Sequence, residues 1–210
     1  MGLTPSKLSS AHKSLILDAS VLINILGTGC PDVILRAMRR VVTVDEITLR
    51  EVNIDPATGQ GAEKVLAQLQ SCSLLKIIRM GDQAYAQFIG LTGAQPPDDL
   101  DDGEAATLAQ AACSNYVAVI DERKATRISS STFPKMPLLN SIDLLAAPEL
   151  IDELGRDGLS DLIYLALRDS RMRVPPNARP WVMNLLGDKR AQDCPSLGCS
   201  PLRVFNRLKR

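Results

Sequence analysis

Short apolar runs alternate with segments in which apolar residues recur at helical spacing through the first 147 residues. A run such as Leu15-Ile-Leu17 is typical of a buried strand in a parallel sheet. The spacing of apolar residues over 19–26 is instead typical of one helix face. Strands are expected at 14–18, 41–44, 74–78, 117–120 and 137–139, with helices between them. This alternation predicts an α/β fold with a central parallel sheet.

The pattern changes after Pro148, where only helical segments follow. Their spacing predicts helices at about 149–155, 159–170 and 178–186. The chain is therefore expected to divide into a flexible polar leader (1–13), a sheet-containing domain (14–147), a C-terminal helical extension (148–187) and a flexible basic tail (188–210).

The composition narrows the chemistry that is open to the chain. Hydrophobic residues make up 45% of the 210 residues, which excludes disorder. No apolar run reaches the about 18 residues that a membrane helix needs. Five cysteines, an odd number, favour reduced thiols in a cytoplasmic protein, with Cys194 and Cys199 inert. The one histidine, His12, argues against histidine triads and histidine-rich zinc sites, and leaves carboxylates and a metal ion as catalytic tools.

Charge is divided unevenly along the chain, although the net charge is zero. Residues 1–150 contain 13 Lys and Arg against 17 Asp and Glu, whereas residues 171–210 contain 9 against 2. An acidic body with a basic end is typical of a metal-dependent enzyme that binds a polyanion. An ordinary solvated tail explains the basic end equally well.

Two acidic residues, Asp18 and Asp121, each follow an apolar strand and precede a helix. Because ligands of parallel sheets bind beyond the carboxyl ends of the strands, the two carboxylates are expected to lie close together there. Such crowding is costly unless a cation lies between them. Glu51, Asp101 and Glu104 follow on the intervening elements, and Mg²⁺ and Mn²⁺ prefer carboxylate ligands. The set predicts a metal site, although each acid taken singly is more typical of a turn, a cap or a solvated helix.

Four segments that occur in order between residues 14 and 187 resemble the PIN-domain family. They are Leu15-Ile-Leu-Asp18-Ala-Ser20, Leu49-Arg-Glu51-Val52, Leu100-Asp-Asp-Gly-Glu104-Ala105 and Ile120-Asp-Glu-Arg-Lys-Ala-Thr-Arg127. The combination is similar to a bacterial branch with an Asp-x-Gly-Glu-Ala motif. The resemblance implies a three-layer α/β/α fold in which 14–147 is a PIN-like nuclease domain.

The resemblance also implies metal-dependent hydrolysis of phosphodiester bonds in RNA, less often in DNA, with Mg²⁺ or Mn²⁺ as cofactor. Single-stranded RNA is the expected substrate, and toxin-type ribonucleases belong to the same class. By position, the catalytic acids are expected to be Asp18, Glu51, Glu104 and Asp121. The expected metal ligands are Asp18, Asp101, Glu104 and Asp121, and the expected substrate contacts are Ser20, Arg123, Arg127 and Ser141.

One segment, Asn140-Ser141-Ile142-Asp143, departs from the Gly-Thr-x-Gly turn that the branch has after its fifth strand. Asp143 is expected to add bulk and charge at the mouth of the site. This departure and the unusual tail favour an alternative function, a catalytically weak or inactive PIN-like scaffold that binds a protein partner. A receiver-type phosphoacceptor domain is a third function class. It would need adjacent acids just after the first strand and a lysine at the end of the last, and the sequence shows neither.

The helical extension has two apolar faces whose partner the sequence leaves open. One lies on residues 159–167, and the other contains Trp181, Val182, Leu185 and Leu186. We expect these faces first of all to cover the core of the sheet-containing domain. The alternatives are that they form a two-fold dimer or a groove that receives an antitoxin helix. The expected partners are therefore RNA, an antitoxin or other small protein, and a second copy of the chain, with no membrane.

Overall fold

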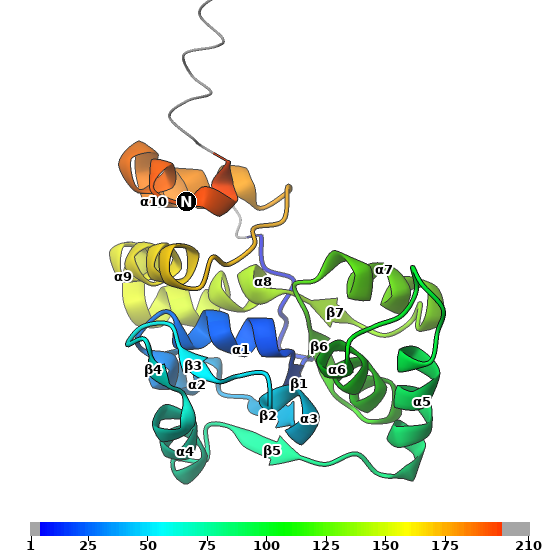
Figure 1. The fold of residues 1–210 in the computed structure, drawn as a ribbon. Coiled ribbons are helices and arrows are strands. Elements are labelled where there is room, and N and C mark those ends of the chain that lie inside the picture. The colour runs from blue at the N-terminus through cyan, green and yellow to red at the C-terminus, as the bar shows by residue number, and fades with distance from the viewer. Residues whose placement is uncertain (1–4, 199–210) are drawn as a thin grey trace, which may run out of the picture.

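A five-stranded parallel sheet lies at the centre of the computed structural model, which describes residues 5–198 (Figure 1). The strand order is β5-β2-β1-β6-β7. The strands are β1 (Ser14–Leu17), β2 (Val41–Asp45), β5 (Lys76–Ile78), β6 (Val117–Val119) and β7 (Leu138–Leu139). Two short strands, β3 (Ile54–Asp55) and β4 (Gln60–Gly61), form a separate antiparallel pair. The predicted α/β fold with a central parallel sheet is confirmed.

Helices cover both faces of the sheet, which gives three layers (Figure 1). They are α1 (Ala19–Leu26), α2 (Pro31–Met38), α3 (Glu46–Leu49), α4 (Glu63–Ser71), α5 (Asp82–Thr92), α6 (Asp102–Cys113), α7 (Arg123–Thr132), α8 (Ser141–Leu145), α9 (Pro148–Asp169) and α10 (Arg179–Gln192), followed by the 3-10 turn η1 (Pro195–Leu197). One face is packed by α1, α2, α4 and α8 to α10, and the other by α5 to α7.

The alternation of side chains along β1 explains why both faces are covered. Leu15 and Leu17 are fully buried in the core that contains α1 and α9, while Ile16 is fully buried in the core that contains α6. Successive side chains of a strand point to opposite faces, so an uninterrupted apolar run needs a helix layer on each side. The strand that bears Asp18 at its end is therefore held rigidly in the middle of the molecule.

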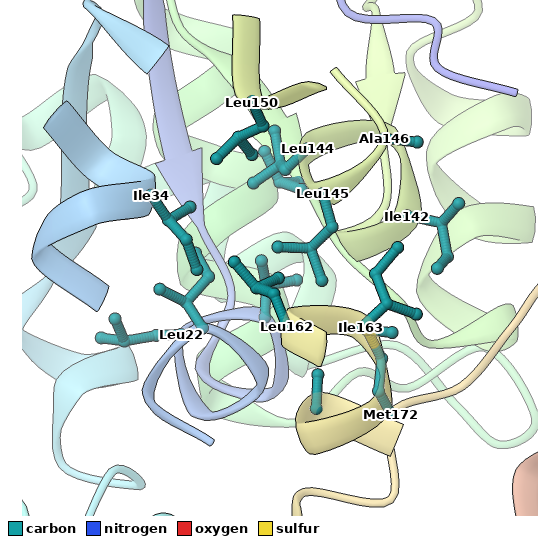
Figure 2. Packing of buried hydrophobic residues seen from close by; sticks show 14 of the residues in the cluster. Leu22, Ile34, Ile142, Leu144, Leu145, Ala146, Leu150, Leu162, Ile163 and Met172 are labelled. Carbon is teal, nitrogen blue, oxygen red and sulfur yellow. The ribbon is translucent and has the colours of Figure 1, made fainter. Parts of the chain in front are cut away.

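The predicted helical extension packs into the same core as the sheet. Figure 2 shows Leu22 of α1, Leu145 of α8 and Leu162 of α9 within one cluster of apolar side chains. The apolar face predicted on 159–167 is used in this way, and Trp181 packs half-buried against the same cluster. Within the described residues, these two faces are covered by the chain itself. The predicted dimer and antitoxin contact stay predictions.

The ends of the described chain differ from the sequence-based boundaries. Helix α10 continues past residue 188, with a break at Gly187, whose φ of 72° is one that glycine adopts readily. Cys194 and Leu197 are buried in the same apolar core as α9 and α10. The remainder of the predicted tail, 199–210, which includes Cys199, lies outside the described residues.

The leader is also anchored where the structure describes it. Leu8 is buried, and the backbone N–H of Lys7 donates to Asp143 Oδ1 at 2.8 Å. The Arg40 guanidinium donates to the carbonyl of His12 at 2.9 Å and forms an ion pair with Glu149 at 2.6 Å. These contacts attach residues 7–12 to α8 directly and to α9 through Arg40.

Within residues 5–198, no single helix is both long and apolar enough to cross a membrane. Helices α1 and α2, which are bent by 115° relative to each other, meet the requirement only as a pair.

Replacing Leu162 by Ala is expected to lower the free energy of unfolding by about 3 kcal/mol, because the side chain is 2% exposed and joins α9 to the sheet layer. Chemical denaturation should show one cooperative transition. The control is Met183→Ala, at a side chain that is 40% exposed, for which a change within about 0.5 kcal/mol is expected. Two separate transitions in the parent protein would show that the extension does not share the core.

Candidate functional site

The candidate site lies where the strand order of the sheet reverses. From β1 the chain runs outward through β2 to β5, and it then returns to the other side of β1 as β6 and β7. Beyond the carboxyl ends of β1 and β6 this topology opens a crevice, the usual ligand position in open parallel sheets. Asp18 and Asp121 end these two neighbouring segments, and the Asp18 N–H donates to the Val119 carbonyl at 3.0 Å. The sequence-based expectation that the two acids meet is confirmed.

Asp18 is both the last residue before the crevice and the N-cap of α1. Its Oδ2 accepts hydrogen bonds from the Ser20 hydroxyl at 2.6 Å and from the Ser20 N–H at 3.2 Å. The carboxylate is 4% exposed. A backbone hydrogen bond from Ala19 adds to these two and also lowers the pKa of the carboxyl.

Asp121 is held by three donors. Ser141 donates from its N–H to Oδ1 at 2.8 Å and from its hydroxyl to Oδ2 at 2.6 Å. The Asn24 amide donates to Oδ2 at 2.8 Å and also to the Ser141 hydroxyl at 3.0 Å. Residues from α1 and α8 thus fix the orientation of a carboxylate that follows β6.

The other predicted acids come from α6 and from the turn after α3. Asp101 is the N-cap of α6 and accepts from the Glu104 N–H at 2.8 Å. The carboxylate of Glu51 lies against Gly103 and accepts a backbone hydrogen bond from it. A hydrogen bond from the Thr48 hydroxyl to the Gly103 carbonyl, at 3.1 Å, joins α3 to α6.

All five predicted acids line one pocket of about 710 Å³, which we call the acidic pocket. Its acidic residues are Asp18, Glu51, Asp101, Glu104, Asp121 and Glu122, and its cationic residues are Lys124, Arg171 and Arg173. Arg173 is paired with Glu122 at 3.1 Å. Carboxylates therefore outnumber cations by two to one in a concave site of ligand size.

The crowding of carboxylates affects how they ionise. Burial, followed by repulsion from Asp101 and Asp18, raises the pKa of the Glu104 carboxyl to about 7. The same causes in the same order raise the pKa of Glu51. Burial also raises the pKa of Asp18 and of Asp121, against hydrogen bonds from Ser20 and Ser141 that lower it. Each of these groups would be stabilised in its charged form by a cation.

The donor set suits a hard divalent cation. Glu104 is 5% exposed, and its Oε2 is buried without a hydrogen-bond partner in the described chain. A buried carboxylate oxygen without a donor is costly, and a cation is one group that removes the cost. Among residues 5–198, no group of three or more His, Cys, Asp or Glu side chains is already arranged so that it could hold a metal ion.

The predicted substrate contacts lie in three different places. Ser20 lines the acidic pocket beside Asp18. Ser141 is 1% exposed and bonded to Asp121, so it orients a carboxylate. Arg123 and Arg127 line a neighbouring pocket, and Arg127 is paired with Asp98 at 2.7 Å.

Asp143 does not lie at the mouth of the acidic pocket, so that expectation is wrong. The side chain is 2% exposed and turned toward the leader. Its Oδ2 accepts from the Asn140 N–H at 3.0 Å, while the Asn140 side chain accepts from the Asp143 N–H at 3.1 Å. Asp143 thus completes a capping box of α8 and leaves the acidic pocket unobstructed.

Several residues of the acidic pocket were missed from the sequence, among them Glu122, its sixth carboxylate. Asn24 is a polar residue among the apolar positions of α1, a signal that could have been used. Lys124, Arg171 and Arg173 line the acidic pocket, two of them from the segment after α9. No local pattern marks those arginines, because only the packing of α9 brings their segment to the sheet edge.

Comparison with known proteins adds nothing to this geometry, since no family model, curated protein or solved structure matches the chain.

The raised pKa of Glu104 predicts a pH-dependent stability for the metal-free protein. The pKa of the Glu104 carboxyl rises from 4.5 in the unfolded chain to about 7 in the folded protein, so folding takes up a proton between these two pH values. The folded protein is therefore expected to lose stability as the pH rises from about 4.5 to about 7. The expected loss is on the order of 3 kcal/mol. Glu104→Gln should flatten this profile and be the more stable protein above about pH 7.

Chemical denaturation in EDTA across the pH range measures this effect. The exposed Glu153→Gln variant on α9 controls for the loss of one negative charge. A parent protein as stable at neutral pH as at acidic pH would contradict the assignment of Glu104 as a buried carboxyl without a partner.

Proposed function

We propose that the chain is a divalent-metal-dependent nuclease that hydrolyses phosphodiester bonds in single-stranded RNA, as a member of the PIN-domain family that its motifs resemble. One observation supports this above the others. The buried Glu104 Oε2 has no donor within the described residues, and it lies in a pocket with five further acidic residues. A binding surface built for an anion or for a neutral ligand would not gather carboxylates in this way.

Asp18, Glu104 and Asp121 are the residues that would hold Mg²⁺ or Mn²⁺, with Asp101 and Glu51 at the same pocket. When bound, the ion would polarise the phosphate and supply a water nucleophile at neutral pH. Asn24 and Ser141 keep the Asp121 carboxylate in one orientation, and Ser20 does the same for Asp18. No histidine is required as a base under this scheme.

The cations of the pocket suit a phosphate substrate. Arg171 makes no ion pair within the described residues, and Lys124 is 4.0 Å from Asp99. Both are available to contact non-bridging oxygens of an RNA strand as it approaches the acids. No aromatic side chain lines the pocket formed by residues 5–198, so base stacking is not part of the scheme there. Backbone contacts of this kind predict cleavage with little sequence preference.

Asp18→Asn is expected to reduce the rate of RNA cleavage at least about a hundredfold. The substitution removes one negatively charged ligand of the metal ion, and the ion would stabilise the charge of the transition state by several kcal/mol. The substitution should leave the fold intact. Both hydrogen bonds from Ser20 reach one oxygen, Oδ2, which the Asn carbonyl replaces. Cleavage of a labelled unstructured RNA in Mn²⁺ measures the effect.

Asp157→Asn, at an exposed acid on α9, is the matched control and should cleave at the parent rate. Cleavage by Asp18→Asn at the parent rate would contradict the proposed nuclease. A parent protein that cleaves no RNA in Mg²⁺ or Mn²⁺ would instead favour the scaffold alternative.

A further inference from the structure

A second pocket adjoins the acidic pocket and shares Asp121 and Arg173 with it. Its volume is about 380 Å³, and its walls come from the leader, α7, the start of α8 and the segment 173–178. We call it the basic pocket, because Lys7, Arg123, Arg127 and Arg173 all line it. The scheme proposed above gives it no role.

Two of the four cations in the basic pocket are free to bind an anion. Arg127 is paired with Asp98 at 2.7 Å, and Arg173 with Glu122 at 3.1 Å. Lys7 and Arg123, both exposed, form no ion pair within residues 5–198. A charged ligand would therefore find its unpaired partners at the leader and at the first turn of α7.

The two acids that line the basic pocket offer little opposition to such a ligand. Both oxygens of Asp121 accept hydrogen bonds from Ser141, and one also from Asn24. Both oxygens of Asp143 accept backbone N–H donors, from Lys7 and Asn140. These four oxygens are directed at protein donors, so an anionic group that enters the pocket meets the cationic side chains and not the carboxylate oxygens.

The rest of the lining is of mixed character. Pro175 and Pro176 supply apolar surface, and Asn140 and Asn177 supply side-chain amides. A nucleobase has apolar faces and hydrogen-bonding edges, and this combination suits it. Pockets for small ligands have volumes of roughly 300–1,000 Å³. The basic pocket lies near the lower end of this range, so it has room for a single nucleotide and not for a longer segment.

We propose that the basic pocket holds one nucleotide of the RNA substrate, adjacent to the scissile phosphate, with its phosphate on Arg123 and Lys7 and its base against Pro175 and Pro176. The proposal rests on the nuclease function proposed above. The shared wall of Asp121 and Arg173 joins the pocket directly to the acids, so a strand can occupy both at once. Arg123 and Lys7 act in binding and do not contact the reacting atoms.

Calorimetry of the full chain in EDTA tests the pocket without catalysis, with adenosine monophosphate (AMP), adenosine and inorganic phosphate as probes. AMP should bind more tightly than either of the others, because it uses both the cations and the apolar wall. Arg123→Ala should weaken AMP binding about tenfold. Arg127→Ala should weaken it less, since Asp98 already neutralises that guanidinium. Lys64→Ala, at an exposed residue of α4, controls for the loss of one positive charge.

Steady-state cleavage of RNA supplies an independent readout. Arg123→Ala should raise KM about tenfold and leave kcat within about twofold of the parent, because the contact is the same in the ground state and in the transition state. Equal AMP affinity of the parent and of Arg123→Ala would overturn the proposal. Equal affinity of the parent for AMP and inorganic phosphate would also overturn it.

The failure of the pocket and the failure of the nuclease are distinguishable. AMP binding that depends on Arg123, in a protein that cuts no RNA, would overturn the nuclease function while supporting a nucleotide pocket. RNA cleavage that depends on Asp18, in a protein whose AMP binding is unchanged by Arg123→Ala, would overturn the pocket alone.

Discussion

Burial of several carboxylates together at one end of a parallel sheet is the constraint on which the rest of this structure depends. Asp18 and Asp121 end neighbouring segments, and α6 adds Glu104 to the same pocket. Burial raises the pKa of all three, so the fold bears a cost for holding them together. Hydrogen bonds offset part of that cost at the two aspartates, where Ser20, Ser141 and Asn24 donate. Glu104 Oε2 has no such donor in the described chain. The remaining cost is what a divalent cation would remove.

The architecture around the pocket serves to hold these groups in place. β1 is buried on both faces, so the position of Asp18 is fixed by packing on each side. Hydrogen bonds from Thr48 to the Gly103 carbonyl and from the Gly103 backbone to Glu51 hold the turn after α3 against α6. Helix α9 shares the core with α1 and α8, and the segment after it supplies Arg171 and Arg173 to the pocket wall. The helical extension is thereby a structural part of the site.

The sequence predicted those features that depend on local pattern. The apolar run of β1 and the acid that follows it indicated a strand end, and the parallel topology then implied that Asp18 and Asp121 meet. Contacts between segments distant in sequence were not predictable in this way. Asn24 bonds Asp121 across 97 positions, and Ser6 and Lys7 anchor the leader on Asp143, more than 130 positions away. The error at Asp143 has the same origin. Its position in the motif predicts a side chain at the mouth of the acidic pocket, whereas the hydrogen bond from Lys7 of the leader turns the side chain away from that pocket. The resemblance ends near residue 187 and gave no indication that Cys194 and Leu197, beyond it, are buried.

The most direct test of the central claim is a calorimetric titration of the metal-free protein with Mn²⁺ in buffers of different ionisation enthalpy, which counts the protons released. Saturable binding is predicted, with more proton release as the pH falls from about 8 to about 6, because a carboxyl with a pKa of about 7 must lose its proton to become a ligand. Glu104→Gln should bind more weakly and release fewer protons. Absence of saturable binding, or a proton release that Glu104→Gln leaves unchanged, would contradict the account.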